Sequence, residues 1–391
     1  MRKIIISFLL LSFVSVFSQQ KTIEQKVEVL LKQMTLEEKI GQLNQYNDDG
    51  SVATGIVTAD NDVFGQVKRG QVGSILNANG TVRTAIWQKM AMESRLKIPL
   101  IFGQDVVHGY KTTFPIPLAE AASWDLGAME QSARVAATEG AAAGIQWTFA
   151  PMVDISRDPR WGRVMEGAGE DTYLGSKIAY ARVKGFQGKG IGNTDAMMAC
   201  AKHFAAYGAA IGGRDYNAVD MSNNMLWNVY LPPFKATVDA GVATFMNSFN
   251  DINGIPATAN EYIQRDILKG KWKFDGFMVS DWGSIGDLVN HGYSADRKEA
   301  AFDAITAGSD MDMESRCYRD YLAELVKEKR VDISLIDDAV RRILRKKFEL
   351  GLFDDPFKFC NAEREKAALN NPEHTKIARS VAQKSIVLLK N

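Results

Sequence analysis

Polar side chains that can carry out chemistry stand at the ends of short apolar runs along this chain. They are Asp105, Lys202 with His203, Asn247, Asp281, and Asp310 with Asp312. The clearest case is GFMVSDWGS (276–284), in which an apolar run stops at an acid, Asp281. A carboxylate fixed at the end of a rigid strand can act as a nucleophile or accept hydrogen bonds from Lys and His side chains. The sequence therefore predicts a polar site assembled from several strand ends.

Apolar runs of this kind alternate with helical patterns over most of the chain. Seven of them are expected to be strands, at 72–76, 99–105, 147–151, 196–203, 243–248, 276–281 and 307–313. An eighth strand is expected near 41–43 or within an irregular loop. Helices are expected between the strands, for example at 82–95, 129–143 and 333–348, the last with Ile336, Val340, Ile343 and Leu344 on one face.

This alternation predicts an α/β fold with a parallel sheet. We favour a (β/α)8 TIM-like barrel, which need not be regular, because the active site of such a barrel forms where the C-terminal strand ends converge. A doubly wound open sheet is the alternative. No glycine-rich phosphate loop follows the first expected strand, so the barrel is preferred.

The composition excludes several kinds of ligand. Among 391 residues, Lys plus Arg and Asp plus Glu each total 47, so net charge favours neither nucleic acid nor an anionic membrane surface. The three cysteines make no disulfide framework, and the four histidines show no zinc-ligand spacing. We expect a small or neutral ligand and neither a metal nor an organic cofactor.

The N-terminus has the pattern of a secretory signal peptide, which we assign to residues 1–18. Arg2 and Lys3 precede an apolar run that ends near Phe17, and the run is too short for an ordinary membrane-spanning helix. An uncleaved N-terminal anchor is the alternative. We expect a periplasmic or secreted protein that does not contact the membrane after cleavage.

A series of motifs, in order along the chain, resembles the β-glucosidases of glycoside hydrolase family 3, in particular their periplasmic bacterial branch. The motifs are GQDVVHG (103–109), FPIPLAEAASWD (114–125), SRDPRWGRVMEGAGED (156–171), AKHFAAYG (201–208), MNSFNDINGIPAT (246–258), GFMVSDW (276–282), AGSDMDM (307–313), RRILRKKFELGLF (341–353) and SIVLLKN (385–391). The resemblance implies a barrel followed by an α/β sandwich domain. It also implies exo-acting, retaining hydrolysis that releases terminal β-D-glucosyl residues from neutral oligosaccharides or glycosides, with β-xylosidase-type specificity as the alternative.

The resemblance also implies roles for individual residues. Asp281 matches the nucleophile, and Trp282 is expected to stack on the sugar beyond the cleaved bond. Four residues match groups that hold hydroxyls of the terminal sugar, and a fifth lines the same subsite: Asp105, Arg163, Lys202 and His203, and then Met246. The other charges of the loop that carries Arg163, including Asp154, are interpreted as internal salt bridges.

Several of these residues have a simpler alternative. Asp281 can instead cap the helix that follows it. Lys202 can instead be the Schiff-base lysine of an aldolase barrel, although neighbouring carboxylates would keep it protonated. Three alternating acids, Asp310, Asp312 and Glu314, can bind a cation, but a solvated or structural acidic turn is preferred because no carbonyl-rich Gly loop accompanies them.

The resemblance places the domain boundary near residue 356. Residues 19–356 are expected to form the barrel, and residues 357–391 a linker and the first strand of a truncated C-terminal domain. Retaining hydrolysis needs a second carboxylate as acid and base, which the family supplies from that domain. Glu166 and Glu170 are the substitutes within this chain. A sugar-binding protein with impaired catalysis is the alternative function, and the sequence leaves the oligomeric state open.

Overall fold

Eight short parallel strands form the centre of the molecule. The computed structural model describes residues 21–48 and 62–391, so the predicted signal peptide lies outside the described residues. The strands are β1 (Asn44–Asn47), β2 (Ser74–Leu76), β3 (Ile101–Gln104), β4 (Trp147–Thr148), β5 (Cys200–Phe204), β6 (Thr244–Asn247), β9 (Phe277–Val279) and β10 (Asp312–Met313). They pair in the orders β10-β1-β2-β3-β4 and β5-β6-β9.

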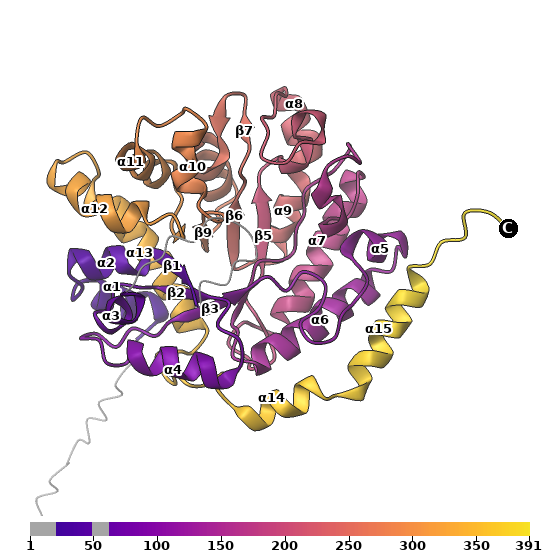
Figure 1. Cartoon of the computed structure of the whole chain (residues 1–391), viewed down its shortest axis with the longest axis horizontal. Helices are drawn as coiled ribbons and strands as arrows, with labels where there is room; N and C mark the ends of the chain where they lie inside the picture. The colour runs from indigo at the N-terminus through magenta and orange to yellow at the C-terminus, as the bar shows by residue number, and fades with distance from the viewer. Residues whose placement is uncertain (1–20, 49–61) are drawn as a thin grey trace, which may run out of the picture.

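Single parallel bridges join these two sheets at both of their edges. Trp147 pairs with Met198, and Met152 pairs with Lys202, which connects β4 to β5. Val279 pairs with Met311, which connects β9 to β10. The eight strands therefore follow one another around a closed ring with helices outside it (Figure 1), and the predicted (β/α)8 barrel is confirmed.

The seven expected strands are all found at the predicted segments, with β5 ending one residue later than predicted, at Phe204. The eighth was predicted near 41–43, and this was wrong by a few residues: Gly41 and Gln42 end a helix, and the strand follows at Asn44–Asn47. Its sequence, NQYN, is polar although all four residues are buried. Some of these side-chain amides form hydrogen bonds inside the barrel, for example a 2.8 Å bond from Gln45 Nε2 to Ser74 Oγ. The strand was misplaced because the prediction relied on apolar runs, and NQYN is not apolar.

Helices cover the outside of the ring. They are α1 (Ile23–Leu31), α2 (Leu36–Gln42), α3 (Val63–Lys68), α4 (Thr81–Ala91), α5 (Pro117–Ala122), α6 (Leu126–Ala142), α7 (Thr172–Gln187), α8 (Asn223–Met225), α9 (Pro232–Asp239), the π-helix Tyr262–Lys271, α10 (Ser284–Asn290), α11 (Arg297–Ala307), α12 (Cys317–Lys327) and α13 (Ile333–Glu349). In α13 the four apolar residues predicted to share a face are fully buried. A small antiparallel pair, β7 (Asp251–Ile252) and β8 (Ile255–Pro256), extends one loop. None of the described helices is long and apolar enough to cross a bilayer.

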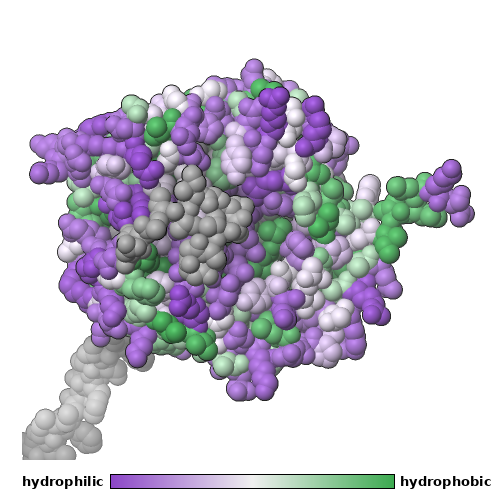
Figure 2. Space-filling view, in the orientation of Figure 1, coloured by the Kyte–Doolittle hydropathy of each residue, from purple (hydrophilic) through white to green (hydrophobic). Residues whose placement is uncertain are grey.

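Two further helices, α14 (Ala362–Leu369) and α15 (Pro372–Lys384), follow the barrel. Both pack against α6 on the outside of the molecule (Figure 1). Residues 386–391 have no regular structure, and the side chains from Ile386 to Leu389 are largely exposed, at 54% to 92%. They form the apolar projection at the C-terminus in Figure 2. The strand predicted there, and the second domain it would begin, stay predictions.

One lysine is buried in the barrel wall without an acidic partner among the described residues. Lys347 of α13 has no exposed surface, and its Nζ donates to Gln42 Oε1 at 2.6 Å and to the Gly73 carbonyl at 2.9 Å. Burial lowers its pKa to about 7. The pKa of a lysine in the unfolded chain is about 10.4. Between these two pKa values the unfolded chain binds more protons than the folded chain, so this residue makes stability rise with pH.

We therefore expect Lys347→Met to change how stability depends on pH. The advantage of the wild type over the variant should grow by about 2 kcal/mol between about pH 7 and about pH 9, because only the wild type gains stability from deprotonating a buried lysine. Chemical denaturation of both proteins at the two pH values measures this. Lys366→Met, on the exposed surface of α14, should keep the wild-type dependence. Parallel pH profiles for wild type and Lys347→Met would show that Lys347 is solvated.

Candidate active site

A cavity of about 810 Å³ opens at the C-terminal ends of the strands. Its volume is typical of a small-molecule site. Six of the seven predicted site residues line it: Asp105, Arg163, Lys202, Met246, Asp281 and Trp282. Further polar and aromatic residues also line the cavity, among them Glu166, Asp215, Tyr216, Phe249, Asp287 and Glu314. The seventh predicted residue, His203, lies behind Asp281 and has no exposed surface.

Asp281 stands two residues beyond β9, held by the Ser280 amide, which donates to the Met311 carbonyl at 2.8 Å. Its Oδ1 accepts from the Trp282 amide at 2.7 Å, whereas its Oδ2 is buried and has no hydrogen-bond partner among the described residues. The helix that follows, α10, begins after Gly283 with no side-chain cap. The alternative of Asp281 as a helix cap is therefore wrong, and one of its oxygens forms no hydrogen bond with the described residues.

The charge of Asp281 is balanced by cations that surround the cavity. Burial raises the pKa of this carboxyl to about 6, while the positive charges of Arg163 and Lys202 act to lower it. The acid is consequently ionised at neutral pH but has a higher proton affinity than an exposed aspartate. Asp281 is therefore a charged carboxylate with few water molecules around it, and such a group is a suitable nucleophile.

Lys202 forms an ion pair with Asp105, with 2.6 Å between Nζ and Oδ1. Burial acts to lower the pKa of Lys202, but the charges of Asp105 and Glu166 outweigh it and the pKa lies above its ordinary value. The lysine is therefore protonated and cannot be the neutral amine that a Schiff base requires. The aldolase alternative is not supported, and the ammonium group is a hydrogen-bond donor at the cavity wall.

Arg163 comes from a 3-10 turn, Gly162–Glu166, that covers one side of the cavity. Its guanidinium binds both oxygens of Glu166, at 2.7 and 3.1 Å, and lies over the Tyr207 ring at 5.5 Å. Burial acts to raise the pKa of Glu166, yet the bond from Arg163 and the charge of Lys202 bring it below its ordinary value. Glu166 is thus held as a carboxylate, while the other candidate substitute, Glu170, is exposed and does not line the cavity.

Apolar and aromatic groups form the remaining wall. Met246, at the third position of β6, is almost fully buried. Tyr216 and Phe249 contact each other edge to face, with ring centroids 4.6 Å apart. Trp282 follows the acid directly and is partly exposed. Aromatic faces beside fixed carboxylates, ammonium and guanidinium groups suit a polyol, whose C–H faces are apolar and whose hydroxyls form hydrogen bonds.

A residue that the sequence analysis missed lies behind this wall. Asp154 Oδ2 accepts from the backbone amide of His203 and lies 2.9 Å from the Nδ1 atom of the same residue. The opposite ring nitrogen, Nε2, is 3.6 Å from Asp281 Oδ2. Burial lowers the pKa of His203 well below its usual value and raises that of Asp154 to about 7. The predicted internal salt bridge of Asp154 is in fact a contact with a histidine beside the candidate nucleophile.

The three alternating acids of the 310–314 segment bind protein donors. Asp310 contacts Lys269 Nζ at 2.6 Å, and Asp312 accepts from the amides of Ser315 and Tyr318. Glu314 accepts from the Asn47 amide. These bonds favour the structural interpretation of the acidic turn over a cation site.

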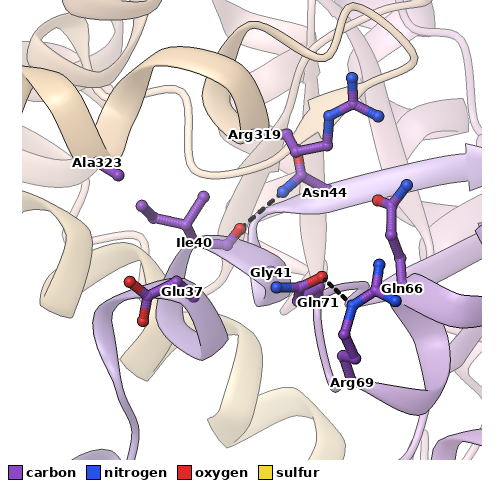
Figure 3. Close-up of a pocket in the computed structure, with 9 residues that line it drawn as sticks. All are labelled: Glu37, Ile40, Gly41, Asn44, Gln66, Arg69, Gln71, Arg319 and Ala323. Atoms are coloured by element: carbon purple, nitrogen blue, oxygen red, sulfur yellow. Dashed lines mark hydrogen bonds between the residues drawn. The ribbon is translucent and has the colours of Figure 1, made fainter.

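A second cavity, of about 270 Å³, lies near the opposite end of β1 between α2, α3 and α12 (Figure 3). Its two arginines are engaged: Arg69 binds Asp62 and Gln71, and Arg319 binds Asp320. Its wall includes the carboxylate of Glu37 but no residue of the Asp281 group. The chemistry of the candidate site therefore belongs to the larger cavity.

Comparisons with known proteins identify the family of the chain. Residues 35–346 match the family model of the glycosyl hydrolase family 3 N-terminal domain. The chain is 45% identical to a periplasmic beta-glucosidase of Salmonella typhimurium, over 93% of this chain and 47% of that protein. It is 32% identical to a putative beta-xylosidase of Formosa agariphila, over 100% of this chain and 56% of that protein.

Solved structures of beta-glucosidases also resemble this chain in fold. The crystal structure of a beta-glucosidase from Listeria innocua in complex with isofagomine superposes with a TM-score of 0.89 at 41% identity, covering 94% of this chain and 51% of that one. The chain thus spans about half the length of the relatives it matches. On the match of its sequence and fold, the chain belongs to glycosyl hydrolase family 3.

Proposed function

We propose that this chain supplies the nucleophile and the terminal-sugar subsite of an exo-acting, retaining glycoside hydrolase that removes β-D-glucosyl residues. The observation that carries the proposal is the free Oδ2 of Asp281, buried at the cavity wall with Arg163 and Lys202 nearby. The activity is a proposal because the relatives are about twice as long as this chain.

In the proposed reaction, a lone pair of Asp281 Oδ2 attacks the anomeric carbon of the terminal sugar. The bond from that carbon to the leaving oxygen breaks, and its electron pair departs with the oxygen, which must be protonated unless it is a stable anion. The product is a glycosyl ester of Asp281. Water then attacks the same carbon from the opposite face and releases both the sugar and the carboxylate.

The other predicted residues would hold the sugar. Asp105 can accept hydrogen bonds from two hydroxyls, and Lys202 and Arg163 can donate to others. His203 is proposed for the same task from the family resemblance, and Met246 and Trp282 would border the ring, with Trp282 beyond the cleaved bond. The ligand would be a neutral oligosaccharide or glycoside, in keeping with cation and anion counts that are equal over the whole chain.

The acid and base of this reaction would come from outside residues 21–48 and 62–391. A retaining enzyme needs a second carboxyl about 5 to 5.5 Å from the nucleophile. The other carboxylates at the cavity all have protein partners: Asp105 binds Lys202, Glu166 binds Arg163, Asp215 accepts from Trp161, Asp287 accepts from Asn290, and Glu314 accepts from Asn47.

Glucose is the preferred terminal sugar in this proposal. The relative with 45% identity is named a beta-glucosidase, and one solved structure of the Listeria innocua protein contains glucose. Beta-xylosidase names among relatives of about 32% identity make xylose the alternative. The periplasmic relative and the signal-like residues 1–18 support a periplasmic or secreted location.

Covalent labelling tests the nucleophile directly. A 2-fluoro glucoside with a dinitrophenyl leaving group should attach one sugar to the wild type, with the added mass on the peptide that contains Asp281. Asp281→Asn should remain folded and unlabelled because only the attacking oxygen is changed. Asp287→Asn, an acid in the same cavity on α10, should label normally. Labelling of Asp281→Asn on another carboxylate would exclude Asp281 from the role.

The kinetics of this chain alone test whether the acid comes from outside it. General acid catalysis contributes roughly 10²- to 10⁴-fold, and most with a poor leaving group, so hydrolysis of cellobiose should be very slow. Dinitrophenyl glucoside should instead give a burst of phenolate near one equivalent, then a slow phase that azide accelerates. Rapid cellobiose hydrolysis would place an acid within this chain. A folded sample without a burst would favour the catalytically impaired sugar-binding protein.

The burst should also depend on pH. Its rate constant should fall as the pH decreases through about 6, because a protonated Asp281 cannot attack. Lys202→Met removes a positive charge that stabilises the ionised acid, so the decline should begin at higher pH. Stopped-flow measurements of phenolate release over the pH range give both midpoints. A variant midpoint at or below that of the wild type would contradict the proposed charge balance.

A further inference from the structure

A histidine ring lies between two buried carboxylates at the bottom of the cavity. His203 Nδ1 is 2.9 Å from Asp154 Oδ2, and His203 Nε2 is 3.6 Å from Asp281 Oδ2. The side chains of Asp154 and His203 have no exposed surface. The two atoms that face each other across 3.6 Å, Nε2 and Asp281 Oδ2, are both without hydrogen-bond partners among the described residues.

Asp154 is held rigidly beside this ring. Met152 forms a bridge with Lys202, and the Val153 amide donates to the Lys202 carbonyl at 2.8 Å, so Asp154 ends an extension of β4 that runs along β5. One oxygen of Asp154 serves both the backbone amide and the ring of His203. The Tyr207 ring contacts the imidazole edge to face, with 5.1 Å between centroids. Position and plane of the ring are both fixed.

We propose that Asp154 is a positioning residue for the nucleophile and acts through His203, an inference that rests on the proposed role of Asp281. An ionised Asp154 accepts the proton of Nδ1, which places the lone pair of Nε2 toward Asp281. Two acceptor atoms then face each other, which explains why they stand at 3.6 Å rather than at hydrogen-bond distance.

This arrangement keeps Asp281 Oδ2 reactive. If the ring carried its proton on Nε2 instead, that proton would be donated to Oδ2 and would occupy the attacking lone pair. A hydrogen bond to the charged form would also lower the proton affinity of the nucleophile, and with it its nucleophilicity. Asp154 thus selects the tautomer that leaves the attacking oxygen without a donor, although Asp154 touches neither Asp281 nor the cavity.

Other charged or titratable groups also face Asp281, and they come from several segments. They are Asp105 after β3, Arg163 and Glu166 of the 162–166 turn, Lys202 and Tyr207 in and after β5, and Tyr216. At the Nδ1 side of the ring the hydrogen-bond partner is Asp154, and the charges of Arg163 and Glu166 and the Tyr207 amide also act on that carboxylate. Asp154→Asn keeps the size of the side chain and an acceptor oxygen, so it removes the negative charge beside the histidine with little displacement of these groups.

The test is the rate of covalent labelling by the 2-fluoro glucoside in Asp154→Asn. At about pH 8, where both acids are ionised in the wild type, the rate constant at saturating reagent should fall roughly ten- to a hundredfold. The acid limb of the pH profile should move to lower pH, because one buried negative charge is lost and Nε2 can now carry a proton. Glucose affinity by calorimetry should fall much less than the labelling rate, since Asp154 does not line the cavity and only the sugar contact proposed for His203 can change.

A double-mutant cycle shows whether the effect passes through the histidine. In a His203→Gln background, Asp154→Asn should have no further effect on labelling. Lys347→Met removes a buried polar group of α13 whose partners, Gln42 and Gly73, do not line the cavity, and this variant should label at the wild-type rate. This variant controls for the general loss of stability.

Four outcomes would overturn the inference. An unchanged labelling rate and pH profile in Asp154→Asn would make Asp154 a structural acid. If Asp154→Asn lowers the labelling rate equally in the wild-type and His203→Gln backgrounds, Asp154 does not act through His203. Weaker glucose binding with an unchanged saturating rate would assign the pair to sugar binding. If Asp154→Asn does not fold, wild-type labelling by His203→Gln decides against the proposal. Failure of the wild type to label at Asp281 would instead refute the proposed function.

Discussion

The functional end of this barrel depends on keeping one carboxylate charged while it is removed from water. Burial raises the pKa of Asp281 to about 6, and without nearby positive charge a group this enclosed would take up a proton near neutral pH. Arg163 and Lys202 prevent this, and each is itself anchored by an acid, Glu166 and Asp105. The cavity is therefore a set of mutually dependent charges, in which the loss of any one leaves a partner uncompensated.

The barrel meets this requirement because its strands are short and buried. β9 has three residues, all without exposure, between β6 and β10, so Asp281 follows a segment that cannot shift. Close approach is possible where β3 carries Gly103: a Cβ there would lie 2.8 Å from the Phe149 ring. That contact packs the extension of β4 against β3, and the same extension delivers Asp154 to His203. Interior packing and site geometry are thus set by the same residues.

Local pattern predicted the strands and three of the cavity residues, Asp105, Lys202 and Asp281, whereas Arg163, Met246 and Trp282 were expected from the family resemblance. An apolar run that ends at Asp105, Lys202 or Asp281 predicts a strand and also a polar site residue at the end of that strand. Asp154 was missed although it carries the same signal. The run WTFAPMVD (147–154) also stops at an acid, but the predicted strand ends at residue 151, and the neighbouring arginines suggested salt bridges. The partner of Asp154 lies 49 residues away in β5. Only the pairing of the two strands, which is a tertiary property, brings the residues together.

The helices after the barrel illustrate the same limit of local reasoning. Residues 357–391 were predicted as a linker with a helix before a final strand, and the sequence did not show that α15 is fixed to α6 through a buried histidine–carboxylate contact. His374 Nδ1 lies 2.7 Å from Glu139 of α6, and Glu139 also accepts from the amides of Lys111 and Thr112. Those amides belong to the loop that begins at Asp105. A single buried carboxylate therefore ties the orientation of α15 to the segment that carries a cavity acid. Because Glu139 binds both His374 and the Lys111 and Thr112 amides, a displacement of α15 is expected to disturb the loop after β3 directly.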